Sequence, residues 1–184
     1  MSGVIPPQTW QKTTTVALAR WLLGKVLVRT TPRGREARAI LETEAYVGAH
    51  DLACHASKGC TPRTQVMFGA GGVWYVFLCY GIHEMLNLVV GPAGHPAAIL
   101  IRGVERAVGP GRLTKQLNID RALNGKLAAP ASGLHLEDHG IVAPRGKIVV
   151  GPRVGVDYAG PIWAAKLWRF RIAPEDLRRP REKA

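Results

Sequence analysis

The sequence predicts a single-domain protein of the mixed α/β class, in which strands and short helices form one α+β fold. Its 184 residues, 47% of them hydrophobic, are enough to bury one core. Segments that alternate polar and apolar residues between short turns indicate strands, and capping residues ahead of apolar stretches indicate short helices. We find no internal repeat and no linker, so residues 1–184 form one predicted domain.

The N-terminal part begins with a predicted helix and a predicted hairpin. A threonine among residues 13–15 caps a helix that Gly24 ends. Residues 25–30 then alternate, and a Pro32-Arg33-Gly34 turn leads into a second strand at 37–44.

The remaining elements follow from the same signals. Asp51 can cap a short helix, and a Tyr80-Gly81 turn joins two strands into a second hairpin. Residues 128–140, rich in Ala, Pro, Gly and His, are predicted to be a loop, and residues 1–11 and 174–184 are expected to be flexible. The predicted helices are 52–56, 61–68, 111–118 and 120–123, and the predicted strands are 73–79, 82–90, 97–103, 147–150, 154–156 and 167–172.

The charge of the chain favours a polyanionic partner. Lys and Arg outnumber Asp and Glu by 25 to 13, which gives a formal net charge of +12. Such an excess can neutralise phosphates, but charge alone leaves DNA, RNA and a membrane surface open. The three cysteines, together with the lack of a leader or an apolar run of membrane-spanning length, predict a soluble, intracellular protein of the cytoplasm or nucleoid, and we expect a monomer.

The densest group of functional residue types lies between residues 41 and 87. In the segment Glu42-Thr43-Glu44-Ala45-Tyr46, strand alternation puts Glu42, Glu44 and Tyr46 on one face. Two carboxylates and an aromatic ring therefore stand at the end of a hairpin strand, which is a rigid support for a catalytic group. Downstream lie A-C-H-A-S at 53–57, T-P-R at 61–63, W-Y-V-F-L-C-Y-G at 74–81, Asn87 and Arg102.

These segments resemble, in composition and in order, the signature of the alkyladenine (3-methyladenine) DNA glycosylase family. The similarity extends from about residue 17 to residue 172. It implies a curved, mostly antiparallel sheet and a base-excision-repair enzyme that flips out and removes alkylated or deaminated purines from double-stranded DNA. Typical family substrates are 3-methyladenine, 7-methylguanine, hypoxanthine and ethenoadenine. The resemblance implies neither a cofactor nor a metal.

The resemblance also implies roles for individual residues. Glu44 matches the general base that activates water, Tyr80 matches the residue that intercalates into the DNA, and Arg102 matches an arginine that contacts DNA or the pocket. Glu42 is interpreted as a local ion-pair partner of the site and not as a second catalyst. The implied base-pocket residues are Tyr46, His55, Phe77 and Asn87. The family usually has Tyr where this chain has Phe77, a change that keeps the stacking surface but removes a hydroxyl.

Other interpretations of the same residues remain open. A lone Glu is most often a surface ion-pair residue, a lone Asn is most often a turn or cap residue, and aromatic residues often fill the core. The main alternative function is a non-catalytic damaged-DNA-binding module. A metal-dependent hydrolase is a second alternative, although the spacing of its candidate ligands matches no common zinc module; these ligands are His50, Cys54, His55 and Cys60. Since no lysine is placed beside the acid, the glycosylase interpretation predicts a monofunctional enzyme without lyase activity.

Overall fold

The computed structural model describes residues 3–12 and 14–180. The strands are β1 (Gly3–Val4), β2 (Val26–Thr31), β3 (Gly34–Tyr46), β4 (Trp74–Cys79), β5 (His83–Val90), β6 (Ala97–Val104), β7 (Ala107–Val108), β8 (Leu134–Asp138), β9 (Val149–Gly151) and β10 (Arg169–Arg171). The α-helices are α1 (Thr15–Trp21), α2 (Pro110–Gln116) and α3 (Gly160–Ala164). The 3-10 helices are η1 (Pro7–Gln11), η2 (His55–Lys58), η3 (Gln65–Phe68), η4 (Arg121–Leu123), η5 (Pro130–Ser132), η6 (Arg145–Lys147), η7 (Asp157–Ala159) and η8 (Pro174–Asp176).

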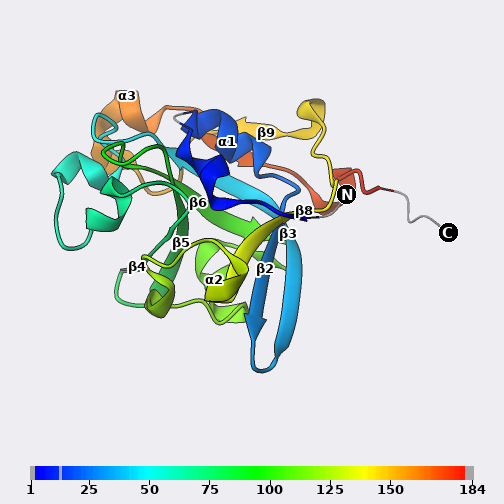
Figure 1. Ribbon diagram of the computed structural model, residues 1–184. Helices are drawn as coiled ribbons and strands as arrows, with labels where there is room; N and C mark the ends of the chain where they lie inside the picture. Colours follow the sequence, from blue (N-terminus) through cyan, green and yellow to red (C-terminus); the bar gives the residue numbers. More distant parts are fainter. Residues whose placement is uncertain (1–2, 13, 181–184) are drawn as a thin grey trace.

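The strands form one ten-stranded sheet in which paired strands run antiparallel (Figure 1). The main order is β1-β8-β2-β3-β6-β5-β4, while β10 pairs with β3 and β9, and β7 pairs with β6. Short helices flank the sheet. The predicted α+β class with a mostly antiparallel sheet is confirmed.

Strand β3 connects the two parts of the sheet. Its first residues, 34–37, are exposed and pair with β2 in a hairpin that projects from the body (Figure 1). Its second half is buried because β6 pairs along one edge and β10 along the other. The register shifts between Ile40 and Thr43, which marks a bulge, and bulges bend a strand and redirect its side chains. Glu44 lies directly after this irregular stretch.

The two faces of β4 pack against different clusters. Trp74 and Val76 belong to the main core, whereas Tyr75 and the partly buried Phe77 pack with Met67 on the other face. Successive side chains of β4 therefore lie on opposite faces of the sheet, as in any regular strand. This arrangement places two aromatic rings beside the segment that follows β3.

Short helices and turns connect the strands largely where sequence signals predict them. Helix α1 begins at Thr15, but Thr14 at its N-cap makes no side-chain capping hydrogen bond, and Thr13 lies outside the described residues. Gly24 ends this region with a φ of +82°, a conformation that favours glycine. The predicted helix at 120–123 corresponds to η4, and Asp120 caps it, since its Oδ1 accepts the Ala122 N–H at 2.8 Å.

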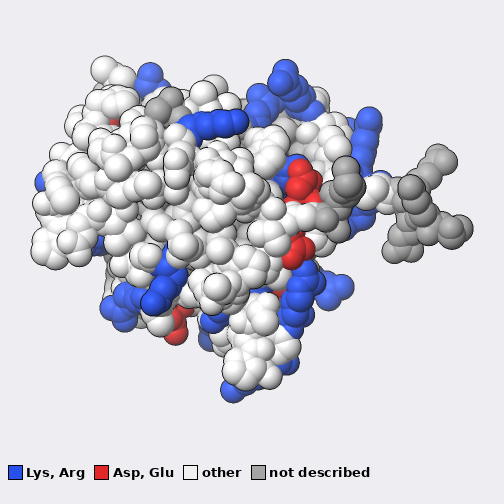
Figure 2. Space-filling model, viewed as in Figure 1, with Lys and Arg blue, Asp and Glu red and all other residues white. Residues whose placement is uncertain are grey.

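Positive charge is spread over the surface. In Figure 2, Lys and Arg side chains lie mostly around the rim of the viewed face and along the β2–β3 hairpin, and few acidic side chains are visible. Within the part of the chain that the structure describes, no helix has the length and hydrophobicity required to span a membrane.

Both ends of the described chain differ from the predicted flexible segments. Trp10 in η1 is fully buried, and its carbonyl accepts the Gly91 N–H at 2.7 Å. Near the other end, Leu177 is buried and Arg178 exchanges two main-chain hydrogen bonds with Val142. Burial of one large apolar side chain can order a polar, proline-containing segment. The overall composition of the two terminal segments does not reveal this effect. Residues 1–2 and 181–184 of the predicted ends lie outside the described residues.

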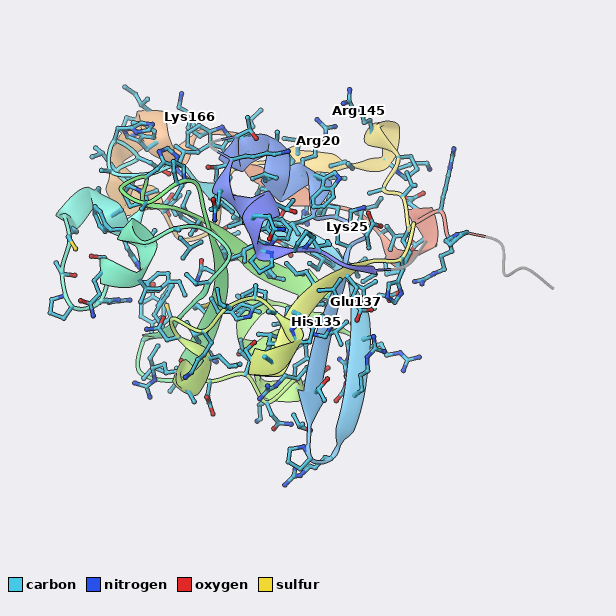
Figure 3. The ribbon with its side chains drawn as sticks, viewed as in Figure 1. Arg20, Lys25, His135, Glu137, Arg145 and Lys166 are labelled. Carbon is cyan, nitrogen blue, oxygen red and sulfur yellow. The ribbon has the colours of Figure 1, made fainter. Side chains whose placement is uncertain are left out.

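The predicted loop at 128–140 contains a strand and is corrected. Strand β8 pairs with both β1 and β2, and its Leu134 and Leu136 side chains are fully buried. The glycine and proline residues around β8 dominate the composition of 128–140, and this composition favoured the loop prediction over the short strand. His135 and Glu137 of β8 lie together near Lys25 (Figure 3), with His135 Nε2 at 2.8 Å from a Glu137 carboxylate oxygen.

The predicted strand at 154–156 and the predicted helix at 52–56 are also wrong. Gly155 has a φ of +71°, which breaks an extended strand, and the Val154 N–H bonds a side chain instead of a strand partner. The Asp51 carboxylate accepts the Ala53 N–H at 3.1 Å, so Asp51 caps a turn, and the helical residues that follow are those of η2. The neighbouring predictions at 61–68 and 167–172 are shortened to η3 and β10, and the predicted strand at 147–150 is shifted to β9.

Candidate active site

A pocket of about 420 Å³ lies between the β4–β5 hairpin, the segment after β3 and the loop before α3. Its volume falls in the range of small-molecule sites. The lining is mainly aromatic and apolar with a few polar groups, and its residues are Tyr46, Ala53, Cys54, His55, Arg63, Met67, Tyr75, Phe77, Leu78, Cys79, Tyr80, Met85, Asn87, Ala98, Leu100, Arg102, Val154, Gly155, Val156 and Tyr158. Six of the seven predicted site residues are among them. The seventh, Glu44, lies directly behind the wall.

Glu44 is fully buried in β3 and is bound by three groups. Its Oε2 accepts the hydroxyl of Tyr46 at 2.8 Å, and its Oε1 accepts the Val154 N–H at 2.9 Å. The Arg102 Nε lies 3.4 Å from the same Oε1. Tyr46, Val154 and Arg102 all line the pocket, so every residue that binds the carboxylate is also part of the pocket wall.

The environment of Glu44 acts on its pKa in both directions. Burial, the largest effect, raises the pKa of Glu44 above its ordinary value of 4.5, and the nearby Glu42 charge adds to this. The Arg102 charge and the hydrogen bonds from Val154 and Tyr46 lower that pKa and limit the rise. Burial, followed by the Glu44 charge, raises the pKa of Tyr46 well above its usual range, so its hydroxyl remains a donor.

Glu42 lies on the same face as Glu44, as the strand alternation predicts. Its Oε1 accepts Arg102 Nε at 3.1 Å and lies 3.5 Å from Arg169 Nη1. Arg102 therefore bridges the two acids. This geometry supports the interpretation of Glu42 as an ion-pair partner, and it places Arg102 in the pocket wall next to Glu44.

Aromatic rings form one side of the pocket. The His55 ring lies 4.6 Å from the Phe77 ring, centroid to centroid, in an edge arrangement, and Tyr75 lies 5.3 Å from Phe77. The His55 Nδ1 is 3.0 Å from the hydroxyl of Tyr75. Burial and, to a lesser extent, the Arg63 charge lower the pKa of His55 to about 4, so its ring is neutral at pH 7. Phe77 has no hydroxyl, and in this chain Tyr75 supplies the hydroxyl nearest to His55.

Asn87 and Tyr80 occupy opposite ends of the site. Asn87 is buried, and its Nδ2 donates to the carbonyls of Tyr75 at 3.1 Å and Met85 at 3.3 Å, which fixes the amide in the pocket wall. Tyr80 is at the tip of the β4–β5 hairpin with a φ of +51°, and 88% of it is exposed. A large exposed ring held in a left-handed conformation is unusual for a non-glycine residue and is typical of a functional position.

Comparison with known proteins decides the family. The sequence model described as methylpurine-DNA glycosylase matches residues 9–109 and 104–176, which is most of the chain. The chain belongs to the methylpurine-DNA glycosylase family.

Individual relatives cover nearly the same length. A Myxococcus xanthus protein is 47% identical over 176 residues, covering 90% of this chain and 89% of the relative. A Methanocella arvoryzae protein is 46% identical over 184 residues, covering 89% and 90%, and a Psychrobacter cryohalolentis protein is 41% identical over 201 residues, covering 93% and 92%. Each carries the name "Putative 3-methyladenine DNA glycosylase".

The site of this methylpurine-DNA glycosylase family member also contains residues to which sequence reasoning gave no role. Arg63 lies over the Phe77 ring at 4.9 Å and lowers the pKa of His55. Its place in the T-P-R motif was the available signal. Arg153 and Asp51 form a buried ion pair behind the pocket, between residues 102 positions apart in sequence. None of the motifs described above contains that arginine.

The residues of the metal-dependent alternative do not form a ligand set. Among the residues that the structure describes, no group of three or more His, Cys, Asp or Glu side chains is arranged to hold a metal ion. His50 packs against Trp163, and His55 bonds Tyr75, while Cys54 lies closest to the carbonyl of Pro96. These side chains are therefore engaged in separate contacts.

Proposed function

We propose that this chain is a monofunctional DNA glycosylase that hydrolyses the N-glycosidic bond of alkylated or deaminated purines in double-stranded DNA. The observation that carries the proposal is the position of Glu44. A buried carboxylate stands behind a preformed aromatic pocket, and the three groups that bind it line that pocket. The family membership and the names of the relatives support the same activity.

A purine in a duplex has to leave the base stack before it can enter such a pocket. The exposed Tyr80 ring on the hairpin tip is suited to fill the space that the flipped nucleotide leaves. Inside the pocket, Tyr46, Phe77 and His55 offer rings that can stack on a base, and aromatic faces favour electron-poor or cationic purines. 3-Methyladenine, 7-methylguanine, hypoxanthine and ethenoadenine are the proposed substrates.

Glu44 is the proposed general base. It would take a proton from water as the oxygen attacks C1′ of the sugar, while the C1′–N bond breaks and its electrons leave with the purine. The negative charge would also stabilise the cationic sugar of the transition state. Arg102 would hold the carboxylate in place and favour its charged form.

The remaining parts of the proposal follow from charge and from the composition of the site. The net charge of +12 and the arginines and lysines on the surface would hold the phosphates (Figure 2). No lysine is among the residues that line the pocket, which supports base removal without a Schiff-base intermediate. We also propose that a monomer is active.

Excision from labelled duplexes tests this proposal. Each duplex carries one hypoxanthine or one 7-methylguanine, and the reaction contains EDTA. We expect release of the base and an abasic site with no covalent adduct after borohydride reduction, because the mechanism uses neither metal nor amine. Tight binding to a damaged duplex with no base release, with or without EDTA, would favour the non-catalytic damaged-DNA-binding module. Base release that occurs without EDTA and is lost when EDTA is added would favour a metal-dependent hydrolase.

A further inference from the structure

A buried ion pair behind the pocket joins Arg153 to Asp51. Both side chains are fully buried, with Arg153 Nη1 at 2.5 Å from Asp51 Oδ2 and Nη2 at 2.9 Å from Oδ1. Removing two charges from water is costly unless the pair is fully engaged in hydrogen bonds. Neither residue lines the pocket, so neither can act by touching the substrate.

The pair ties together three segments of the site. Arg153 also donates to the carbonyl of Ala45 at 2.9 Å, between Glu44 and Tyr46 in β3, and to the carbonyl of Trp163 in α3 at 3.2 Å. Asp51 accepts main-chain N–H groups of the segment between β3 and His55, namely those of Val47 at 3.2 Å and Ala53 at 3.1 Å. The end of β3, the turn that leads to His55 and the loop before α3 therefore share one fixed point.

Two of the three groups that bind Glu44 depend directly on Arg153. Val154, the next residue in the chain, donates its N–H to Glu44 Oε1. The Arg153 guanidinium lies 4.8 Å from the centre of the Tyr46 ring, on which it can make a cation–π contact, and Tyr46 donates to Glu44 Oε2. A change in the Arg153 fork would shift both the Val154 amide and the Tyr46 hydroxyl.

We infer that Arg153, clamped by Asp51, is the positioning residue that holds the Glu44 carboxylate and the Tyr46 ring in reactive geometry. The inference rests on the proposed function. Arg153 acts through other groups and does not itself line the pocket, so its loss should reduce the rate of the chemical step much more than it reduces DNA affinity.

The conservative variant Arg153→Lys tests this inference, because lysine keeps the charge but cannot form a two-pronged bond with Asp51. A matched control is Arg29→Lys. Arg29 also donates to three main-chain carbonyls, those of Leu117, Asn118 and Gly133, but it lies outside the pocket. The measurements are the single-turnover excision rate at saturating enzyme, the Kd for a duplex with an abasic-site analogue, and the Tm.

We expect Arg153→Lys to lower the single-turnover rate by about 10- to 100-fold and to change the Kd by less than about threefold, since small displacements of catalytic groups have effects of this size. Arg29→Lys should lower the Tm but keep the wild-type rate. Asp51→Asn removes the charged partner of Arg153 and should show the same loss of rate with retained binding. If Arg153→Lys does not fold, Asp51→Asn serves as the test.

Wild-type rates in Arg153→Lys, or an equal loss of rate in Arg29→Lys, would overturn the inference. A Kd that rises as much as the rate falls would also overturn it, because that result indicates a general loss of structure. A wild-type chain that releases no base from any damaged duplex would instead overturn the proposed function, and the two failures are therefore distinguishable.

Discussion

Glu44 shows how one side chain can be buried and still remain suited to act as a base. Burial disfavours its charge, while the Arg102 guanidinium from β6 and the Val154 amide and Tyr46 hydroxyl favour it. Glu42, the other charge that faces Glu44, raises the pKa further but is itself paired with Arg102. The result is a carboxylate with a raised pKa, which is more basic than an ordinary exposed glutamate.

This environment predicts the pH dependence of excision. A general base works in its ionised form, so the rate should fall as the pH drops through the raised pKa of Glu44. We expect the acid limb of kcat/KM, which reports on the free enzyme, to have its midpoint above the ordinary value of 4.5. Protonation of His55 would fall near pH 4 and should not set this limb. A pH profile whose midpoint lies at or below 4.5 would contradict this explanation.

The β4–β5 hairpin carries Tyr80 at a cost to its own stability. The hairpin pairs without interruption from Trp74 to Cys79, and its turn holds Tyr80 and Gly81 with φ values of +51° and +73°. A left-handed conformation costs a non-glycine residue about 1–2 kcal/mol. An exposed aromatic ring in that position offers the fold no compensating burial, which supports the DNA-binding role proposed for it.

Tyr80→Gly should therefore separate stability from function. Glycine relieves the backbone strain but loses more entropy on folding, and we expect the free energy of unfolding to rise by about 0–1 kcal/mol. Excision and binding to an abasic-site duplex should both weaken, and Tyr80→Phe should behave like the wild type because the stacking surface is kept. Urea denaturation and excision assays check both parts. Full excision by Tyr80→Gly would remove Tyr80 from the proposed mechanism.

Local patterns predict the hairpins well, and they fail where tertiary contacts decide the structure. The continuous apolar and aromatic run from Trp74 to Cys79 and the Tyr80-Gly81 turn that follows it are sufficient to predict β4 and β5. Strand β8 is too short and too close to Gly and Pro to be predicted, and its strand character comes from pairing with β1 and β2. The loop at 154–156 leaves the strand conformation because Gly155 turns it and Glu44 binds its amide.

The candidate site was predicted in the same uneven way. Glu44, Tyr46 and His55 could be named because they lie in contiguous motifs that a single sequence displays. The Arg153–Asp51 pair joins residues that are distant in the sequence, and no local spacing predicts such a contact. The order of the motifs indicated which segments meet, but only the fold shows what holds them together.

Across the whole protein, many acidic side chains are paired, whereas many basic side chains remain at the surface. Acidic side chains are few, and several of them, including Asp51, Glu105 and Glu137, are already paired with arginines of the same chain. Many other Lys and Arg side chains remain at the surface (Figure 2). The positive field is therefore available to phosphates, independently of the sequence of the DNA.

This charge predicts a strong effect of salt on binding and a weak effect on chemistry. With a slope of about 0.9 per neutralised phosphate, two contacts already lower the association constant roughly tenfold from about 50 to about 200 mM salt. The single-turnover rate at saturating enzyme should change little, since Glu44 is buried and screened less. Fluorescence anisotropy and rapid-quench excision over this range measure the two quantities. An affinity that does not depend on salt would exclude phosphate contacts as its source.

The most direct measurement compares Glu44→Gln with Glu42→Gln in single-turnover excision of hypoxanthine. The two glutamates share a strand face and the Arg102 partner, but Glu44 alone has all its carboxylate contacts in the pocket wall. We predict that Glu44→Gln lowers the rate by about 10²- to 10⁴-fold with binding to an abasic-site duplex retained, whereas Glu42→Gln stays within about tenfold of the wild type. Wild-type excision by Glu44→Gln, or an equal loss in both variants, would contradict the assignment of Glu44 as the base.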